Sequence, residues 1–226
     1  MSNTQTATVD RYLETIYCIA AEGETVRPGR LAYWLSVSPP TVSQALQRLE
    51  RDGWIEISED RSVELTAQGS TAAASLIRRH RVLERWLTDM LGFDWAAADV
   101  EADRLSSAIS DEVIDRIDAS MGSPVTCPHG NAIPGRIAPY GDLIALADLP
   151  PGMPAKVCRI SEVAEHEARS LLEKLADHAI EEGSELIMDS PQHHENEIAV
   201  TIAGEPLSLS LEAARLIWVE PMSHAA

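Results

Sequence analysis

Hydrophobic residues in the first third of the chain recur with the spacing of three helices and then of two strands. The first helix is predicted over residues 9–20, and the second over residues 28–35. After a tight turn, a third helix opens at Pro39 and Pro40, where proline suits a helix start, and stops at Asp52. The pattern predicts a helix, a turn and a second helix placed after a leading helix.

Residues 54–66, WIEISEDRSVELT, read as two short strands around a turn with Arg61 at its tip. This order predicts a winged helix-turn-helix, whose second helix lies in the major groove of DNA. A winged helix used only for protein contacts is the alternative. We expect hydroxyls and amides to meet base edges and phosphates, and arginines to contact phosphates. The candidate DNA-binding residues are Arg27, Arg30, Ser38, Pro40, Thr41, Ser43, Gln44, Arg48, Arg51 and Arg61.

Three further helices with apolar stripes follow the predicted wing. The first covers residues 66–91, capped by Thr66 and ended by Gly92, the second residues 94–109, and the third starts after a Ser110 cap. Because operators are commonly bound by two-fold dimers, such helices suggest a dimerisation unit. Candidates for the buried seam of the first are Ala74, Ile77, Leu83, Trp86, Leu87 and Met90.

Proline and glycine are concentrated in residues 125–154, which marks linkers and a domain boundary. Beyond it, five short segments alternate or cluster like strands, with one helix over about residues 163–178, and they predict a small β-barrel. The chain is thus expected to be mainly α with a small β portion. The three predicted domains are a winged helix at 1–73, a helical dimerisation and metal-binding domain at 74–148, and a barrel at 149–226.

The charge of the chain opposes DNA binding, since its formal net charge is −18. The acids are unevenly spread: residues 1–70 carry 6 arginines and 10 acids, whereas residues 151–226 carry 5 basic and 14 acidic residues. The amino-terminal third is therefore the part least unfavourable to a polyanion. A bound cation that removes local negative charge would help further.

The three cysteines, Cys18, Cys127 and Cys158, are widely spaced and form no CxxC pattern. This usage predicts buried thiols in a reducing cytoplasm, and no apolar stretch reaches the roughly 18 residues that a membrane span needs. Cys127 and His129, in TCPHG, could be soft metal ligands two residues apart. We interpret that segment instead as a loop bounded by prolines.

Two pairs of candidate metal ligands lie on consecutive predicted helices. His80 and Glu84 are four residues apart, as are Asp99 and Asp103, so each pair shares one helical face. On adjacent antiparallel helices the pairs could converge on one ion. The competing interpretation is a solvated acidic face, or ion pairs with nearby arginines.

The order of parts and several motifs resemble the diphtheria toxin repressor family of iron- and manganese-dependent regulators. The matching strings are PTVSQALQRLERDG, EDRSVELT, RRHRVLERWL, SDEVIDRI and PHGNAIPG. The resemblance covers nearly the whole chain and implies an SH3-type carboxyl-terminal barrel. It further implies a homodimer that binds a divalent metal and then double-stranded, palindromic operator DNA of metal-homeostasis genes, usually as a repressor.

The resemblance implies two metal sites. In the ancillary site, His80, Glu84 and Asp99 match ligand positions, and Glu162 and Glu165 fall where two further oxygen ligands are expected. This donor set suits Mn²⁺, with Fe²⁺ next.

The primary site departs from the family pattern. Its positions hold Arg11, Asp103, Ser106 and Ser107 in place of the usual ligands. One hypothesis is that an Arg11–Asp103 ion pair replaces the metal there, which would leave a reduced metal site or a metal-independent, constitutive DNA-binding dimer. A second hypothesis uses Glu14, which with His80 and Asp103 could hold an ion. A metal hydrolase is the remote alternative, but the chain lacks HExxH and any nucleophile motif.

Overall fold

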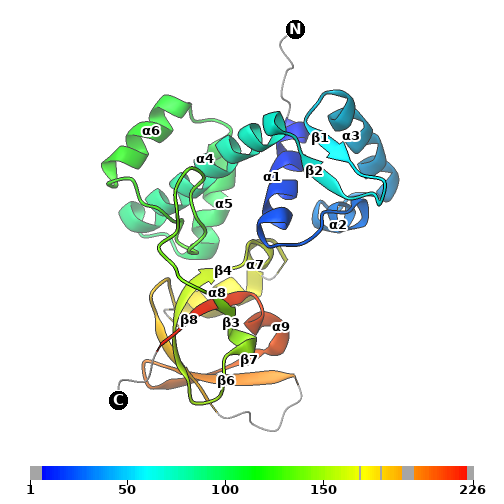
Figure 1. The fold of residues 1–226 in the computed structure, drawn as a ribbon. Helices are drawn as coiled ribbons and strands as arrows, with labels where there is room; N and C mark the ends of the chain where they lie inside the picture. Colours follow the sequence, from blue (N-terminus) through cyan, green and yellow to red (C-terminus); the bar gives the residue numbers. More distant parts are fainter. Residues whose placement is uncertain (1–6, 168, 179, 190–195, 223–226) are drawn as a thin grey trace. The chain divides into compact units, whose positions relative to one another are not determined.

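The computed structural model describes residues 7–167, 169–178, 180–189 and 196–222, and it divides the chain into two compact units (Figure 1). The first unit comprises residues 1–80 and the second residues 81–226. Within the described residues, the structure contains no helix long and apolar enough to cross a membrane.

The first unit confirms the predicted winged helix. Ser38 occupies the N-cap of the third helix, followed by two prolines, and its hydroxyl accepts a hydrogen bond from the Thr41 amide. The two strands pair antiparallel, with Ile55 opposite Leu65. The elements are α1 (Ala7–Ala21), α2 (Pro28–Trp34), α3 (Pro39–Arg51), β1 (Ile55–Ile57) and β2 (Val63–Leu65).

The core of this unit forms because each helix buries one stripe. Leu13 and Ile16 from α1, Leu31 from α2, and Val42 and Leu46 from α3 are almost fully buried. Burial of side chains of this size stabilises a fold by roughly 1.5–3 kcal/mol each. The opposite, polar face of α3 is thereby left at the surface.

Three helices open the next part of the chain: α4 (Ala67–Leu91), which continues from the first unit into the second, α5 (Trp95–Ser106) and α6 (Asp111–Ser120). The Thr66 hydroxyl accepts from the Gly69 amide, as predicted for a cap. The predicted burial of Met90 was wrong, because the last turn of α4 runs past the core and leaves this side chain 59% exposed. Ser110 is the N-cap residue of α6, as predicted, although its side chain makes no capping hydrogen bond. The helical core contains Val82, Leu83, Leu87, Ala98, Ala102, Ile114 and Ile133.

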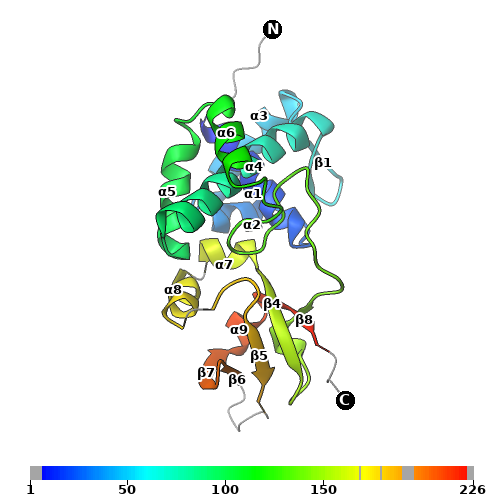
Figure 2. The same cartoon turned by 90° about the vertical axis from the view of Figure 1, so that its left-hand side faces the viewer.

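The carboxyl-terminal domain is built on a six-stranded antiparallel sheet, in the order β3-β8-β4-β5-β6-β7. Strands β4, β5 and β8 of this sheet are labelled in Figure 2. The five predicted strands are confirmed, while β3 and the short α9 were not predicted. The helix predicted over about residues 163–178 is present as helical segments on both sides of residue 168, which lies outside the described residues. The elements are β3 (Ile144–Ala145), η1 (Leu146–Asp148), β4 (Pro154–Ile160), α7 (Glu162–Glu167), α8 (Arg169–Asp177), β5 (Glu185–Met188), β6 (Glu197–Ile202), β7 (Glu205–Ser210), α9 (Leu211–Ala214) and β8 (Ile217–Pro221).

The core of this domain includes residues from outside it. Leu171, Leu172 and Leu175 of α8 pack into the cluster of buried strand residues, as the sequence predicted. Trp95 and Ala96, at the start of α5, join the same cluster. The first turn of α5 therefore belongs to both the helical part and the sheet domain.

Candidate metal centre and nucleic-acid interface

The centre of α4 presents its polar residues inward. Glu84 follows two core residues of that helix and is 0% exposed, although most glutamates remain in water. A carboxylate buried to this extent needs compensating charge or hydrogen bonds. The groups around the Glu84 carboxylate are therefore candidates to hold a cation with it.

One group of potential ligands brings together predicted residues of α4 and α5. His80, Glu84 and Asp99 each offer a ligand atom, and these atoms lie within 4.8 Å of one another. His80 and Glu84 are one turn apart on α4, and Asp99 comes from α5, which starts at the Asp94 cap. His80 and Asp99 are half-buried. The donor set is one imidazole nitrogen and carboxylate oxygens.

A second group shares Glu84 and includes residues that sequence reasoning placed in a loop. Glu84, Cys127 and His129 also offer ligand atoms within 4.8 Å of one another, and all three are buried. The His129 Nδ1 atom lies 3.2 Å from Glu84 Oε1 and 3.9 Å from Cys127 Sγ. The Cys-x-His spacing was the available signal, but nothing in the sequence linked it to Glu84.

The loop that carries this group is held by backbone bonds. Thr126 and Ala132 form an isolated antiparallel bridge, and the Cys127 amide donates to the Asn131 carbonyl at 2.9 Å. The ring of Trp95 meets His129 edge-on, with centroids 5.1 Å apart. The imidazole is thus oriented by packing as well as by Glu84.

Strand β4 fixes the same loop from the sheet domain. The Ile160 amide donates to the His129 carbonyl at 2.8 Å, and the Asn131 side-chain amide donates to the Ile160 carbonyl at 3.0 Å. A Cβ atom on Gly130 would lie 1.9 Å from the Cys158 carbonyl oxygen, so only glycine fits between loop and strand. Loop and strand therefore form one rigid support.

Glu162, one of the two barrel glutamates predicted as ligands, belongs to neither of these two groups. Glu162, at the start of α7, forms a buried ion pair with Arg81, which also donates to the Ala132 carbonyl. Glu162 is only 7% exposed. The side chain of Glu165 lies outside what the structure describes. Glu162 thus has a cationic partner, and its role as a ligand stays a prediction.

The structure describes the local contacts of the primary-site positions. Asp103 and Ser107 are exposed, and the Ser106 hydroxyl donates to the Asp103 backbone carbonyl at 3.1 Å. Arg11 donates to the Leu35 carbonyl at 3.2 Å. Arg11 and Glu14 belong to one unit and Asp103 to the other, so the ion pair and the alternative ligand set both stay predictions.

A further polar cluster lies beside the buried ligands. Glu182 accepts hydrogen bonds from the hydroxyls of Tyr140 and Thr126, and lies 3.5 Å from an Arg85 nitrogen. Burial, followed by the bond to Glu182, raises the pKa of the Tyr140 phenol well above its usual range. The phenol therefore acts as a permanent hydrogen-bond donor.

The predicted recognition surface is exposed along α3. Ser38, Pro40, Thr41, Ser43 and Gln44 all lie at the surface, because the buried stripe of that helix is on its opposite side. The Ser43 hydroxyl donates to the Pro39 carbonyl at 3.1 Å, which orients it. The remaining polar groups suit base edges or phosphates.

Of the five arginines of the predicted interface, three are paired with an acidic side chain that the structure describes and two are not. Arg27, Arg30 and Arg51 are paired with Asp60, Glu24 and Asp52, at 3.0, 2.9 and 2.9 Å.

Hydrogen bonds from Ser62 and the nearby Arg27 hold the pKa of Asp60 below its usual value. Within the described residues, Arg48 and Arg61 have no acidic partner and are exposed. These two are the arginines readiest for phosphate contact.

Comparisons with known proteins agree with this arrangement. The iron dependent repressor N-terminal DNA binding domain matches residues 5–63, the iron dependent repressor metal binding and dimerisation domain matches residues 66–135, and the FeoA domain matches residues 144–221.

Some relatives match over almost their full lengths. The diphtheria toxin repressor of Corynebacterium diphtheriae is 35% identical over 95% of this chain and 97% of its own. The iron-dependent repressor IdeR of Mycobacterium leprae is 33% identical over 94% and 96%. A solved manganese-dependent transcriptional repressor in complex with manganese superposes with a TM-score of 0.82 at 31% identity, over 95% of this chain and all of its own. The chain belongs to the diphtheria toxin repressor family of metal-dependent transcriptional regulators.

Proposed function

We propose that this protein is a cytoplasmic, metal-dependent repressor that binds palindromic operators of metal-homeostasis genes as a homodimer. The observation that carries the metal dependence is the buried Glu84, shared by two groups of potential ligands. The winged helix and the dimerisation domain supply DNA binding and dimerisation. Membership of a family of DNA-binding regulators contradicts the metal-hydrolase alternative.

The residues present fit a divalent cation. A wholly buried carboxylate is costly, and a cation with several ligands compensates for it. His80, Glu84 and Asp99 offer nitrogen and oxygen donors suited to Mn²⁺ or Fe²⁺, whereas the Cys127 thiolate adds a softer donor that favours Fe²⁺. A bound ion would neutralise carboxylates and tie α4 to α5 and to the loop.

The competing account of the second group is a direct contact between Glu84 and His129, without metal. Titration of chelator-stripped protein with Co²⁺ distinguishes the two, because thiolate ligation gives an intense near-ultraviolet charge-transfer band. Cys127→Ser should remove the band. The matched control Cys18→Ser, which changes a buried thiol of the first unit, should retain it. A band absent from the unsubstituted protein would exclude thiolate ligation.

Operator binding tests the function as a whole. Chelator-stripped protein would select duplexes from a random pool with and without Mn²⁺ or Fe²⁺, followed by fluorescence anisotropy on the selected palindrome. We expect metal to tighten binding by at least tenfold, because it fixes the arrangement that the two recognition helices of a dimer require. Equal affinity in chelator and in metal would contradict the proposal.

A constitutive, metal-independent dimer is the second candidate, and the residues at the primary-site positions favour it. Two hydroxyls and an arginine stand where the family pattern has ligands. The triple variant Arg11→Met, Ser106→Glu and Ser107→His should create strong metal dependence if the arginine has replaced the ion. An unchanged metal response in that variant would argue against the replacement.

A further inference from the structure

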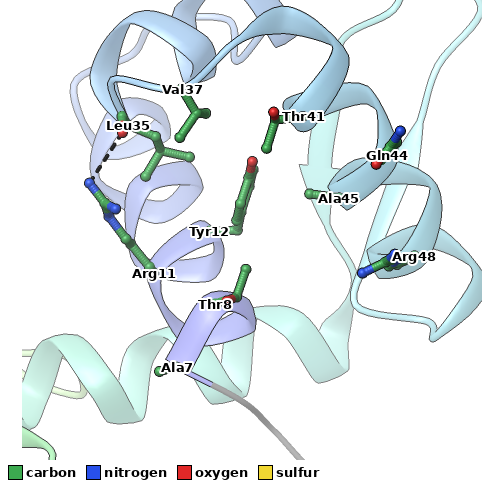
Figure 3. A pocket seen from close by; sticks show the side chains of 10 residues that line it. All are labelled: Ala7, Thr8, Arg11, Tyr12, Leu35, Val37, Thr41, Gln44, Ala45 and Arg48. Carbon is green, nitrogen blue, oxygen red and sulfur yellow. Dashed lines mark hydrogen bonds between the residues drawn. The ribbon is translucent and has the colours of Figure 1, made fainter.

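A pocket of about 470 Å³ lies within the winged helix, between α1 and α3 (Figure 3). Its walls come from the first half of α1, the turn that follows α2, and the outer side of α3. The ring of Tyr12 stands in the middle of the group, with Leu35, Val37 and Ala45 beside it. A volume of this size suits a small organic molecule, and the apolar walls suit an apolar body.

The charges around the pocket are of one sign. Its lining contains Arg11 and Arg48 and, among the described residues, no aspartate or glutamate. A lining with arginines and no acidic residue is unusual in a chain with 36 acidic and 18 basic residues. Arg11 is held against one wall by the Leu35 carbonyl, while Arg48 lies across the pocket and is exposed. A guanidinium with donors to spare is well shaped for a carboxylate.

A second polar group points to a ligand independently. Tyr12 is 5% exposed, and its hydroxyl oxygen has no hydrogen-bond partner among the described residues. Buried polar groups are almost always satisfied, so an unsatisfied hydroxyl next to a cavity indicates a missing partner. Burial raises the pKa of this phenol, which therefore keeps its proton and can donate at neutral pH.

We propose that this pocket binds a small aromatic carboxylate, whose ring packs on Tyr12 and whose carboxylate is held by Arg48. A polar substituent at the far end of the ring would meet the Tyr12 hydroxyl. Thr41, Gln44 and Arg48 line the pocket and also belong to the predicted DNA surface. The bound molecule therefore competes with operator DNA and releases it without removal of the metal.

The binding experiment uses the full chain without DNA and 4-hydroxybenzoate as the probe, followed by calorimetry and ligand-observed NMR. We expect saturable binding in the millimolar range or tighter, and at least fivefold weaker binding of the uncharged analogue 4-hydroxybenzyl alcohol. Tyr12→Phe and Arg48→Gln should each weaken binding at least fivefold. The matched control Arg61→Gln, an exposed arginine outside the pocket, should leave it unchanged.

Three results would overturn the proposal. They are the absence of saturable binding, equal affinity for the uncharged analogue, and unchanged affinity in both pocket variants. Tyr12→Phe keeps the ring that packs in the core, and Arg48→Gln changes only an exposed side chain. Both variants should therefore fold, so that weaker probe binding reports on the pocket.

The competition experiment rests on the proposed function and is read separately. With metal present, 4-hydroxybenzoate should weaken operator binding by at least fivefold at saturation, in proportion to its occupancy. Unchanged operator affinity despite occupancy would overturn competition. If Tyr12→Phe binds the operator more weakly than the unsubstituted protein when no probe is present, the pocket contacts the DNA backbone. That result would overturn the small-molecule site. A protein that binds the probe but no DNA would contradict the proposed function alone.

Discussion

The close approach of Gly130 to strand β4 makes a sharp prediction for the variant Gly130→Ala. Gly130 has a φ of +80°, and a Cβ atom there would lie 1.9 Å from the Cys158 carbonyl oxygen and 2.9 Å from the Arg159 Cα. Both obstacles are backbone atoms, which cannot turn aside as a flexible side chain can. The variant must therefore move the loop away from the strand.

The magnitude has two parts. A left-handed conformation costs an alanine about 1–2 kcal/mol relative to glycine. Forcing an extra carbon into packed structure adds about 1–3 kcal/mol. We therefore expect Gly130→Ala to lower the free energy of unfolding by about 2–5 kcal/mol.

Gly135→Ala is the matched control. Gly135 lies in the same segment with a φ of +87°, but apart from its chain neighbours no atom of the described residues lies within 4 Å of the position of its added Cβ. Only the conformational cost, about 1–2 kcal/mol, is expected there.

The assay is urea unfolding of chelator-stripped protein, followed by circular dichroism. Equal destabilisation by the two variants would refute the reasoning, since it would mean that loop and strand do not press on each other. Because His129 precedes Gly130, Co²⁺ affinity should also fall in Gly130→Ala and remain unchanged in Gly135→Ala.

Three further predictions concern side chains of the second unit. Arg81→Met leaves the buried Glu162 without its ion-pair partner, so urea unfolding should show a loss of about 3–5 kcal/mol, much of it restored by adding Glu162→Gln. Leu83→Ala, at a fully buried position of the helical core, should cost about 2–5 kcal/mol in the same assay. The raised pKa of Tyr140 keeps its phenol protonated in the fold while the unfolded chain ionises, so the unfolding free energy should fall as pH rises above about 10. Tyr140→Phe should make that fall shallower, and an identical pH dependence would disprove the explanation.

Local patterns were sufficient for most of the fold. The two prolines after Ser38 marked the start of α3, and Thr66 and Gly92 marked the two ends of α4, because these residues act through bonds to their immediate neighbours. The exposure of Met90 escaped prediction, since helical spacing shows which face a residue shares but not where the neighbouring core ends.

The candidate site was only half predictable for a related reason. His80 and Glu84 are one helical turn apart, so their spacing alone puts them together. Cys127 and His129 reach Glu84 across more than 40 residues of chain, and Arg81 and Glu162 are separated by 81 positions. Contacts of that kind depend on the packing of whole elements, and no periodicity in the sequence records them.

The bonds between the His129 loop and strand β4 also bear on how separable the carboxyl-terminal domain is. The proline-rich connection invites a truncation before residue 144, but the cut would remove the amide that satisfies the His129 carbonyl and the carbonyl that holds Asn131. Trp95 would lose its place in the sheet domain's core. An evolutionary gain or loss of this domain would therefore require substitutions in the CPHGN segment and at the start of α5 at the same time.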